Sequence, residues 1–204
     1  MNKKYAYTGI DYYSVSRNEY YERFAFPNNP SFFTQIFQSK NTVLPSNIPI
    51  AFRELHFGDK PEIVSSKFGM PRYILENRGI SSQIFFYKEK INQHLVITQL
   101  HFLHEEFFCA SYTFRDDNNA ERVVIKKMIF EKYANMNGTT FETCNSLFDN
   151  SGNHICIFDN VFLHILYLWG DEKVKRAVSG SIRSSNFSEA TKKEKLKGGL
   201  FDKL

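Results

Sequence analysis

Four segments rich in Ile, Val, Phe and Tyr follow one another between residues 72 and 114, with only a few residues between each and the next. β-Branched and aromatic side chains favour strands. Parallel neighbours need a crossover of a dozen or more residues, which these links are too short to provide. The sequence therefore predicts an antiparallel meander with strands over Arg72–Glu76, Gln83–Lys88, His94–Leu103 and Phe107–Phe114.

The third of these segments is apolar on both sides. Side chains alternate between the two faces of a strand, so Ile97 and Leu103 share one face, and Leu100 and Phe102 share the other. A strand with two apolar faces is typical of a buried position. We therefore expect it to be a central strand with protein against both faces.

Two helices are predicted from their boundary residues. In the first, Asp59 and Glu62 form a capping box, Pro61 stands in the first turn, and Gly69 ends a helix over residues 60–68. The second helix is predicted over Ala120–Tyr133 from the same kind of signal. Asn118 is its cap, and Glu121 is the capping glutamate.

Further elements are expected on either side of these two helices. Apolar spacing predicts short helices over Ser31–Lys40 and Glu172–Val178. Three more strands are predicted, with Asp159-Asn160 as a two-residue hairpin turn between the last two; the strands are Thr139–Phe148, Asn153–Phe158 and Val161–Trp169.

The fold class predicted from this order is α+β, with an antiparallel sheet packed by short helices. A helix followed by strands occurs twice, which indicates two tandem repeats, over 50–116 and 117–170, within a core of residues 50–170. A Tyr- and Phe-rich segment with one short helix, residues 1–49, precedes this core. A helix and a basic tail, residues 171–204, follow it.

Charge and hydropathy bound the class of protein. Nine Lys/Arg against five Asp/Glu in residues 171–204 account for the whole net charge of +4, so the rest of the chain is neutral. No segment has the length of a membrane span, and the N-terminus lacks the apolar stretch of a signal peptide. We expect a soluble cytoplasmic protein without a membrane span.

One segment resembles a known family. Residues 52–59 (Phe-Arg-Glu-Leu-His-Phe-Gly-Asp), followed by Glu62-Ile63-Val64 and Phe68-Gly69-Met70-Pro71, resemble the pattern of β-lactamase-inhibitor-protein-like folds, which include the small outer-membrane lipoproteins of the barrel assembly machinery. Residues 148–155 and 161–167 resemble the end of a second such unit. The resemblance implies a helix-packed sheet with an open face that binds another protein, and it carries over no catalytic residue. The chain lacks the export signal and the lipid-attachment cysteine of the envelope members.

Histidine and cysteine are the side chains here that most often carry chemistry. On a strand His101 and His104 point to opposite faces, so they could share a metal ion only if the strand ends near Leu103 and His104 turns round. The predicted hairpin register also places Cys156 and His164 on opposite faces, outside hydrogen-bond reach. All three cysteines, Cys109, Cys144 and Cys156, lie in apolar strands and are expected to be buried structural thiols.

Motifs for phosphate loops, dinucleotide binding and hydrolase nucleophiles are absent. Residues 116–119 resemble a cation loop but lack its glycine and its terminal glutamate, so a turn and a helix cap explain them. We therefore assign no catalytic residue, no metal ligand and no cofactor.

The C-terminal tail offers candidate interaction residues. Three apolar residues follow a glycine pair and a lysine-rich stretch, which is typical of a short docking segment; the candidates are Leu200, Phe201, Leu204, Lys192, Lys193, Lys195 and Lys197. Basic tails also bind nucleic acid. Acidic residues interrupt this one, and we rank nucleic acid below protein as its partner.

The function predicted from the sequence is that of a non-enzymatic protein-binding or adaptor module, such as an assembly factor, chaperone or inhibitor, which acts through a face of its sheet. The prediction rests on aromatic residues on both faces of the sheet, which are more than two short helices can cover. Exposed apolar patches of this kind mark interaction sites. Two alternatives stay open: a small enzyme with an unrecognised acid–base site, and nucleic-acid binding through the tail. In a third arrangement, the N-terminal segment covers the sheet with Phe32, Phe33, Ile36 and Phe37, and the tail then makes the contact.

Overall fold

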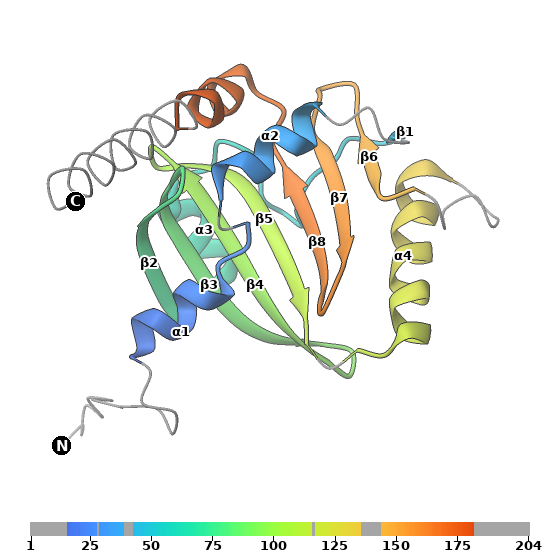
Figure 1. Ribbon diagram of the computed structural model, residues 1–204, viewed down its shortest axis with the longest axis horizontal. Helices are drawn as coiled ribbons and strands as arrows, with labels where there is room; N and C mark the ends of the chain where they lie inside the picture. Colours follow the sequence, from blue (N-terminus) through green and yellow to red (C-terminus); the bar gives the residue numbers. More distant parts are fainter. Residues whose placement is uncertain (1–15, 28, 39–42, 116, 136–143, 182–204) are drawn as a thin grey trace, which may run out of the picture.

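One eight-stranded sheet forms the centre of the protein in a computed structural model (Figure 1). The structure describes residues 16–27, 29–38, 43–115, 117–135 and 144–181. Seven of the eight strands are joined by antiparallel pairing, and β1 is parallel to β6. The order across the sheet is β1-β6-β7-β8-β5-β4-β3-β2. The α+β class predicted from the sequence is confirmed.

The predicted meander is the best-formed part of the sheet. Its four strands pair antiparallel in chain order, and a bulge lies between His101 and Phe102. Because these strands are joined by tight turns, local sequence alone specifies their order. The strands are β2 (Tyr73–Arg78), β3 (Ser81–Ile91), β4 (His94–Leu103) and β5 (Glu106–Phe114).

The second half of the chain completes the same sheet. β8 (Leu163–Leu168) pairs with β5, β7 (His154–Asp159) pairs with β8, and β6 (Ser146–Phe148) pairs with β7. The two predicted repeat segments therefore meet side by side at the β5–β8 contact. β1 (Val43–Pro45) adds a short edge strand that was not predicted from the sequence.

One predicted turn is wrong. Asp159 pairs with Leu163, so three residues rather than two join β7 to β8. Phe162 accepts a hydrogen bond from the Asn160 N–H across this loop. The predicted two-residue turn would pair Cys156 with Leu163. The observed register is shifted by three residues from this, so Cys156 pairs with Leu166.

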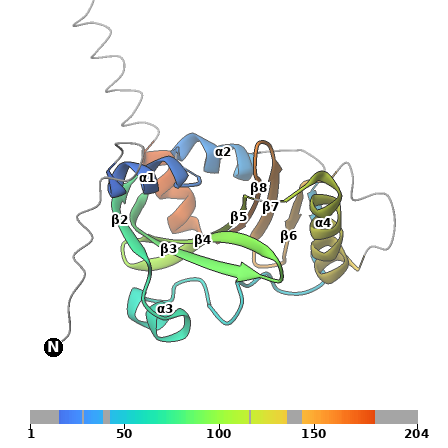
Figure 2. The same ribbon diagram turned by 90° about the horizontal axis from the view of Figure 1, so that it is seen from below.

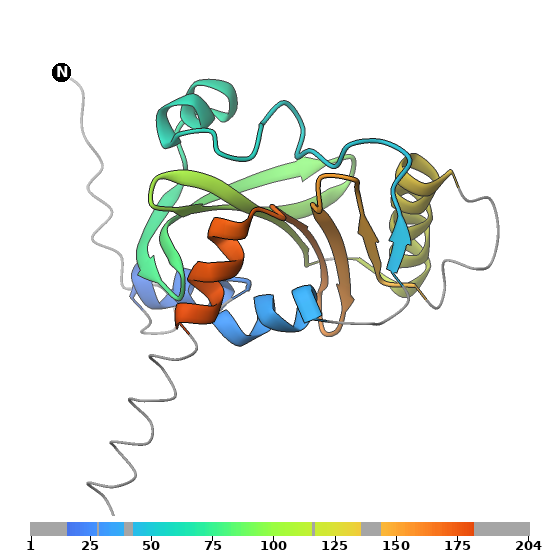
Figure 3. The same ribbon diagram turned by 90° about the horizontal axis from the view of Figure 1, so that it is seen from above.

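Protein covers both faces of the sheet, so the molecule has three layers (Figures 2 and 3). On one face lie α1 (Arg17–Phe24), α2 (Pro30–Gln38) and a helix at residues 172–181. The opposite face is covered by α3 (Pro61–Phe68) and by the connector at residues 46–60, with α4 beside the β6 end of the sheet.

The N-terminal helices close the face that the sequence left available for a partner. Phe33 and Ile36 of α2 are buried in one cluster with Val174 and Val178 of the 172–181 helix. Tyr21 of α1 is buried in a second cluster, on β2, β3 and β4. The arrangement in which the N-terminal segment covers the sheet is therefore the observed one.

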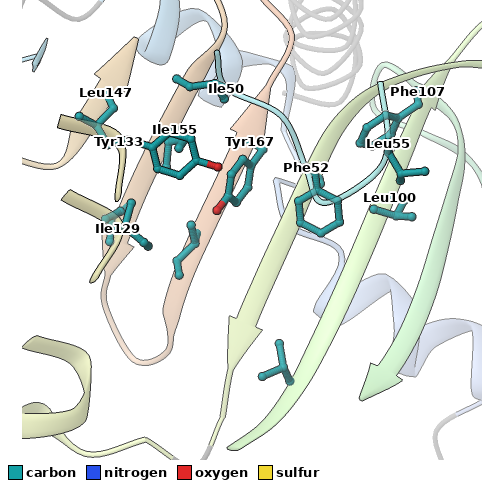
Figure 4. Close-up of a cluster of buried hydrophobic side chains, with 14 of the residues drawn as sticks. Ile50, Phe52, Leu55, Leu100, Phe107, Ile129, Tyr133, Leu147, Ile155 and Tyr167 are labelled. Carbon is teal, nitrogen blue, oxygen red and sulfur yellow. The ribbon is translucent and has the colours of Figure 1, made fainter. Parts of the chain in front are cut away.

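The largest core cluster lies on the opposite face (Figure 4). The connector delivers Phe52 and Leu55 onto β4 and β5, and both side chains are fully buried. α4 (Asn119–Ala134) contributes Ile129 and Tyr133, and Tyr133 lies beside Tyr167 of β8. This packing fixes the connector, and with it α3, against the sheet.

The two predicted helix caps have different outcomes. Asn118 and Glu121 form the reciprocal hydrogen bonds of a capping box on α4. On α3, however, the N-cap is Lys60 and has no side-chain hydrogen bond, so the box predicted at Asp59 is wrong. The Asp59 carboxylate accepts instead from the His56 N–H. Gly69 ends α3 as predicted, with a φ of 79°.

None of the helices in the described ranges is long and apolar enough to cross a membrane.

Candidate functional site

A cleft of about 630 Å³ opens between α3, the connector and β3, and we call it the α3 cleft. Its volume lies within the range of pockets that hold ligands or side chains of a partner. Three stretches of chain that are distant in sequence meet there. The lining residues are Arg53, Glu54, Lys67, Phe68, Met70, Arg72, Tyr87, Lys88 and Glu89.

Arg53 is the most firmly held residue of the cleft. Its backbone has a φ of 54°, in the left-handed region that few residues other than glycine adopt. Its guanidinium donates to the Tyr112 hydroxyl at 2.6 Å and to the Glu89 carboxylate at 2.8 Å. It also lies over the ring of Phe68, 5.0 Å from the ring centroid. Glu89 in turn accepts from the buried Thr98, so these contacts link the cleft wall to the core.

Arg53 also perturbs the tyrosine beside it. Burial raises the pKa of Tyr112 to about 12, and the nearby Arg53 opposes this rise only in part. Tyr112 therefore stays a neutral hydroxyl at physiological pH, able to accept from Arg53 without carrying charge. The arrangement holds a cation at the inner wall of the cleft; it does not activate a base.

The other cations of the cleft differ in how they are satisfied. Lys67 donates to the Glu54 carbonyl at 2.7 Å and lies 3.3 Å from the Asp59 carboxylate. Arg72 and Lys88 are exposed, and neither forms an ion pair with any residue that the structure describes. Lys88 pairs with Ile97 and so points to the face beneath α1, which leaves Arg72 beside Glu54 at the cleft, neither with an ion pair in the described part of the chain.

Apolar side chains border the same cleft. Met70 lines it and is 83% exposed, the largest exposed fraction among the large apolar side chains of the described ranges. Ile63 on α3 and Ile74 on β2 are also exposed. Ile74 is two residues from Arg72 along the chain and so points to the same side of the strand. Exposed apolar groups that lie near one another are typical of an interaction surface.

A row of buried polar side chains crosses the opposite face of the sheet, beneath α1 and α2, and is a second candidate. Its members bond other parts of the chain, except that the Gln99 Nε2 is buried without a hydrogen-bond partner among the described residues. Ser111 and His101 both bond the Phe26 carbonyl, and the Phe26 N–H donates to Gln99. The Phe26 ring stacks on His164 with 4.0 Å between centroids. The row therefore anchors the N-terminal segment.

The histidines of this row are poor acid–base groups. Burial lowers the pKa of His101 to about 4, and burial together with Arg122 lowers the pKa of His164 to about 4. His101 also bonds Ser81, and His164 bonds Thr113, each at 3.0 Å. Both rings are neutral near pH 7 and already have partners, so they hold the structure together here.

A smaller hollow of about 410 Å³ lies at the other end of the sheet, between the β4–β5 turn and the 172–181 helix. Its floor is apolar, with Phe108, Trp169 and Val174. Lys173 at its mouth lies 3.5 Å from the Glu106 carboxylate. Arg176 also lines the hollow and forms no ion pair with any residue in the described ranges, so an unpaired cation lies here as well.

The geometry corrects part of what the sequence predicted for histidine and cysteine. Cys109, Cys144 and Cys156 are all buried, as predicted, and none of the three is in a disulfide. Cys156 and His164 lie on the same face of the β7–β8 hairpin, because the register differs from the predicted one. They have separate neighbours: His164 bonds Thr113, and Ser146 lies 3.8 Å from the Cys156 sulfur. No group of three or more metal-binding side chains occurs within the described ranges.

The interaction residues predicted in the tail lie outside the described residues; they are Leu200, Phe201, Leu204, Lys192, Lys193, Lys195 and Lys197. The α3 cleft was missed by the sequence reasoning. Its cations are single residues on separate segments, and no motif connects them. The one available signal was Met70, an apolar residue directly after the helix-ending Gly69, where a side chain has no helix face to pack against.

Comparison with known proteins gives no relative: no family model, curated protein or solved structure matches the chain.

Proposed function

We propose that the protein is a non-enzymatic binding module of the cytoplasm that docks another protein at the α3 cleft. Tyr87 and Glu89 of β3 line the cleft, so the proposed binding surface includes a small part of one sheet face. The observation that carries the proposal is the conjunction of the exposed Met70 with a lined cavity and with Arg72, which has no ion pair to any residue that the structure describes.

Each part of this conjunction suits a protein partner. Methionine is flexible and polarisable, and it is frequent on surfaces that accept varied partners. The ring of Phe68 offers an apolar wall, and Arg53 is held in place before any partner arrives. A prepositioned wall lowers the ordering cost of binding.

An enzymatic role is supported less well by the same residues. The cleft lining contains no histidine and no cysteine. Burial raises the pKa of Tyr87, which lines the cleft, to about 12. Such a tyrosine is a weak acid and a poor nucleophile near pH 7. Free buried thiols suit a reducing compartment, which supports the cytoplasmic location in the proposal.

The test is a pair of matched substitutions, Met70→Glu in the cleft and Val124→Glu on α4, where Val124 is 55% exposed. A photoreactive amino acid at position 70 first identifies the partner in native cells, and the affinity of the purified partner is then measured for both variants. We expect Met70→Glu to weaken binding about tenfold or more, equivalent to about 1.4 kcal/mol, and Val124→Glu to leave it unchanged. Equal affinities for both variants and the native chain would overturn the proposal.

A further inference from the structure

We infer that the hollow beside the 172–181 helix binds a small monocarboxylic acid with an apolar body. The 172–181 helix lies on the opposite face of the sheet from α3 (Figure 3), so this site is separate from the α3 cleft. Three features of the hollow carry the inference: its apolar floor, its fixed walls, and one cation that has no ion pair within the described ranges.

The floor of the hollow suits an apolar group. Phe108 and Val174 belong to a buried core cluster, and Trp169 and Ala177 are partly buried against the same cluster; all four line the hollow. Trp169 is held in place, because its ring lies parallel to that of Phe57 with 6.3 Å between centroids, and its N–H donates to the Phe108 carbonyl at 2.9 Å. An apolar body placed on this floor is removed from water together with the exposed part of Trp169.

The walls of the hollow are fixed by short-range structure. One wall is the two-residue turn between β4 and β5, where His104 and Glu105 have φ values of 49° and 63°, as tight hairpin turns require. The 172–181 helix forms the other wall, and the ion pair between Lys173 and Glu106 at 3.5 Å joins the helix to the turn. The volume of about 410 Å³ is near the lower end of the range for ligand pockets, which indicates a small ligand.

One cation is left for the ligand. The charge of Lys173 is offset by Glu106. Arg176 lies three residues further along the same side of the helix, is exposed, and has no ion pair within the described part of the chain. Its planar guanidinium binds a carboxylate through two parallel N–H···O bonds. The start of the helix adds no second anion site, since the Lys173 N–H already donates to the Asp171 carboxylate at 2.7 Å.

A carboxylate matches this charge better than other ionised groups. It carries one negative charge near pH 7, which Arg176 alone balances. A phosphate monoester carries a charge of about −1.5 to −2, and its excess negative charge would lie near Glu106 with no further unpaired arginine or lysine in the lining. An ammonium group would be repelled by Arg176 itself.

The experiment uses the full-length chain, with Trp169 as the reporter because it is the single tryptophan of the sequence and lines the hollow. Octanoate is the probe. Acetate lacks the apolar body, octylammonium reverses the charge, and octyl phosphate increases it. We expect octanoate to shift the Trp169 emission and to bind at least about tenfold more tightly than acetate or octylammonium. Octyl phosphate should bind no more tightly than octanoate. Calorimetry measures the same affinities without the fluorophore.

Two substitutions at the hollow and one elsewhere complete the test. Arg176→Gln removes the partner of the carboxylate, and Ala177→Leu fills the hollow; each should weaken octanoate binding about tenfold or more. Lys88→Gln is the control and should leave it unchanged. Lys88 is also an exposed cation without an ion pair in the described ranges, and its strand partner Ile97 lies about 20 Å along β4 from Leu103 at the hollow. Circular dichroism melts establish that all three variants are folded.

Several results would overturn the inference. Octanoate that fails to bind, that binds without a change in Trp169 emission, or that responds equally to Arg176→Gln and Lys88→Gln does not occupy the hollow as inferred. Acetate or octylammonium that binds as tightly as octanoate, or octyl phosphate that binds more tightly, shows that the chemical class is wrong. Each of these results leaves the docking proposed at Met70 to its own test.

Discussion

The backbone at Gly170 packs closely against the backbone at Gly152. A Cβ built on Gly170 lies 1.9 Å from the Gly152 carbonyl oxygen, far inside van der Waals contact. The same contact region is organised by Asp149, whose buried carboxylate accepts from the N–H groups of Ile50 and Asn153. The Asn153 side chain accepts from the Gly170 N–H at 3.1 Å. These bonds join the connector, the β6–β7 turn and the end of β8.

Gly170→Ala is therefore expected to lower the free energy of unfolding by about 3 kcal/mol, because backbone rather than a flexible side chain must move. Gly180→Ala is the control: nothing lies within 4 Å of its added Cβ, and it lies in the 172–181 helix. There alanine should stabilise slightly, by about 0.5 kcal/mol. Urea unfolding followed by Trp169 fluorescence measures both. Similar stabilities for the two variants would show that the Gly152–Gly170 approach is not rigid.

At the scale of helices and strands, the sequence was informative wherever the determining contact is local. The cap on α4 is made by residues three positions apart, and it is present as predicted. The cap predicted at Asp59 fails because Asp59 has competing partners, the His56 N–H and Lys67, which the helix pattern does not include. β1 was missed for a related reason, since its pairing with β6 depends on chain about a hundred residues away.

Asn118→Ala tests the cap on α4. The Asn118 side chain accepts from the Glu121 N–H at 3.0 Å, and the Glu121 carboxylate accepts from the Asn118 N–H at 2.9 Å. Alanine removes the first of these bonds and keeps the backbone N–H that makes the second, and losing the side-chain cap should cost about 1 kcal/mol of stability. Asn119→Ala, at the exposed first helical residue, should change it by less than about 0.5 kcal/mol. Thermal melts by circular dichroism give the comparison, and equal shifts would mean that the box contributes nothing.

For the whole molecule, the aromatic excess seen in the sequence has a structural use. Phe33, Phe52 and Phe130 are among the fully buried rings, and they reach the sheet from layers on both of its faces. An exposed sheet face is therefore not needed to account for these side chains. What the layers leave open is the α3 cleft, whose walls come from the connector, α3 and β3. Sequence reasoning could not predict it, because it exists only once these three segments are packed together.

The order of the strands also predicts how the molecule opens. β4 and β5 each have strand neighbours on both sides, and their side chains are buried along nearly their whole length. β2 and β1 are the two edges, and most side chains of β2 are exposed. Amides that exchange only through global unfolding should therefore lie in β4 and β5, whereas edge amides exchange through local opening.

Hydrogen–deuterium exchange under native conditions measures this difference. We expect peptides from β4 and β5 to exchange at least about a hundredfold more slowly than peptides from β2, equivalent to about 2.7 kcal/mol of additional opening free energy. β3 is the internal control, since it pairs with the edge strand on one side and with β4 on the other, and should be intermediate. The Gly170→Ala variant sharpens the test, because a cooperative sheet transmits the lost stability to β4 and β5 but leaves the local opening of β2 unchanged. Uniform exchange across the four strands would show that the meander opens as one unit, with no separately labile edge.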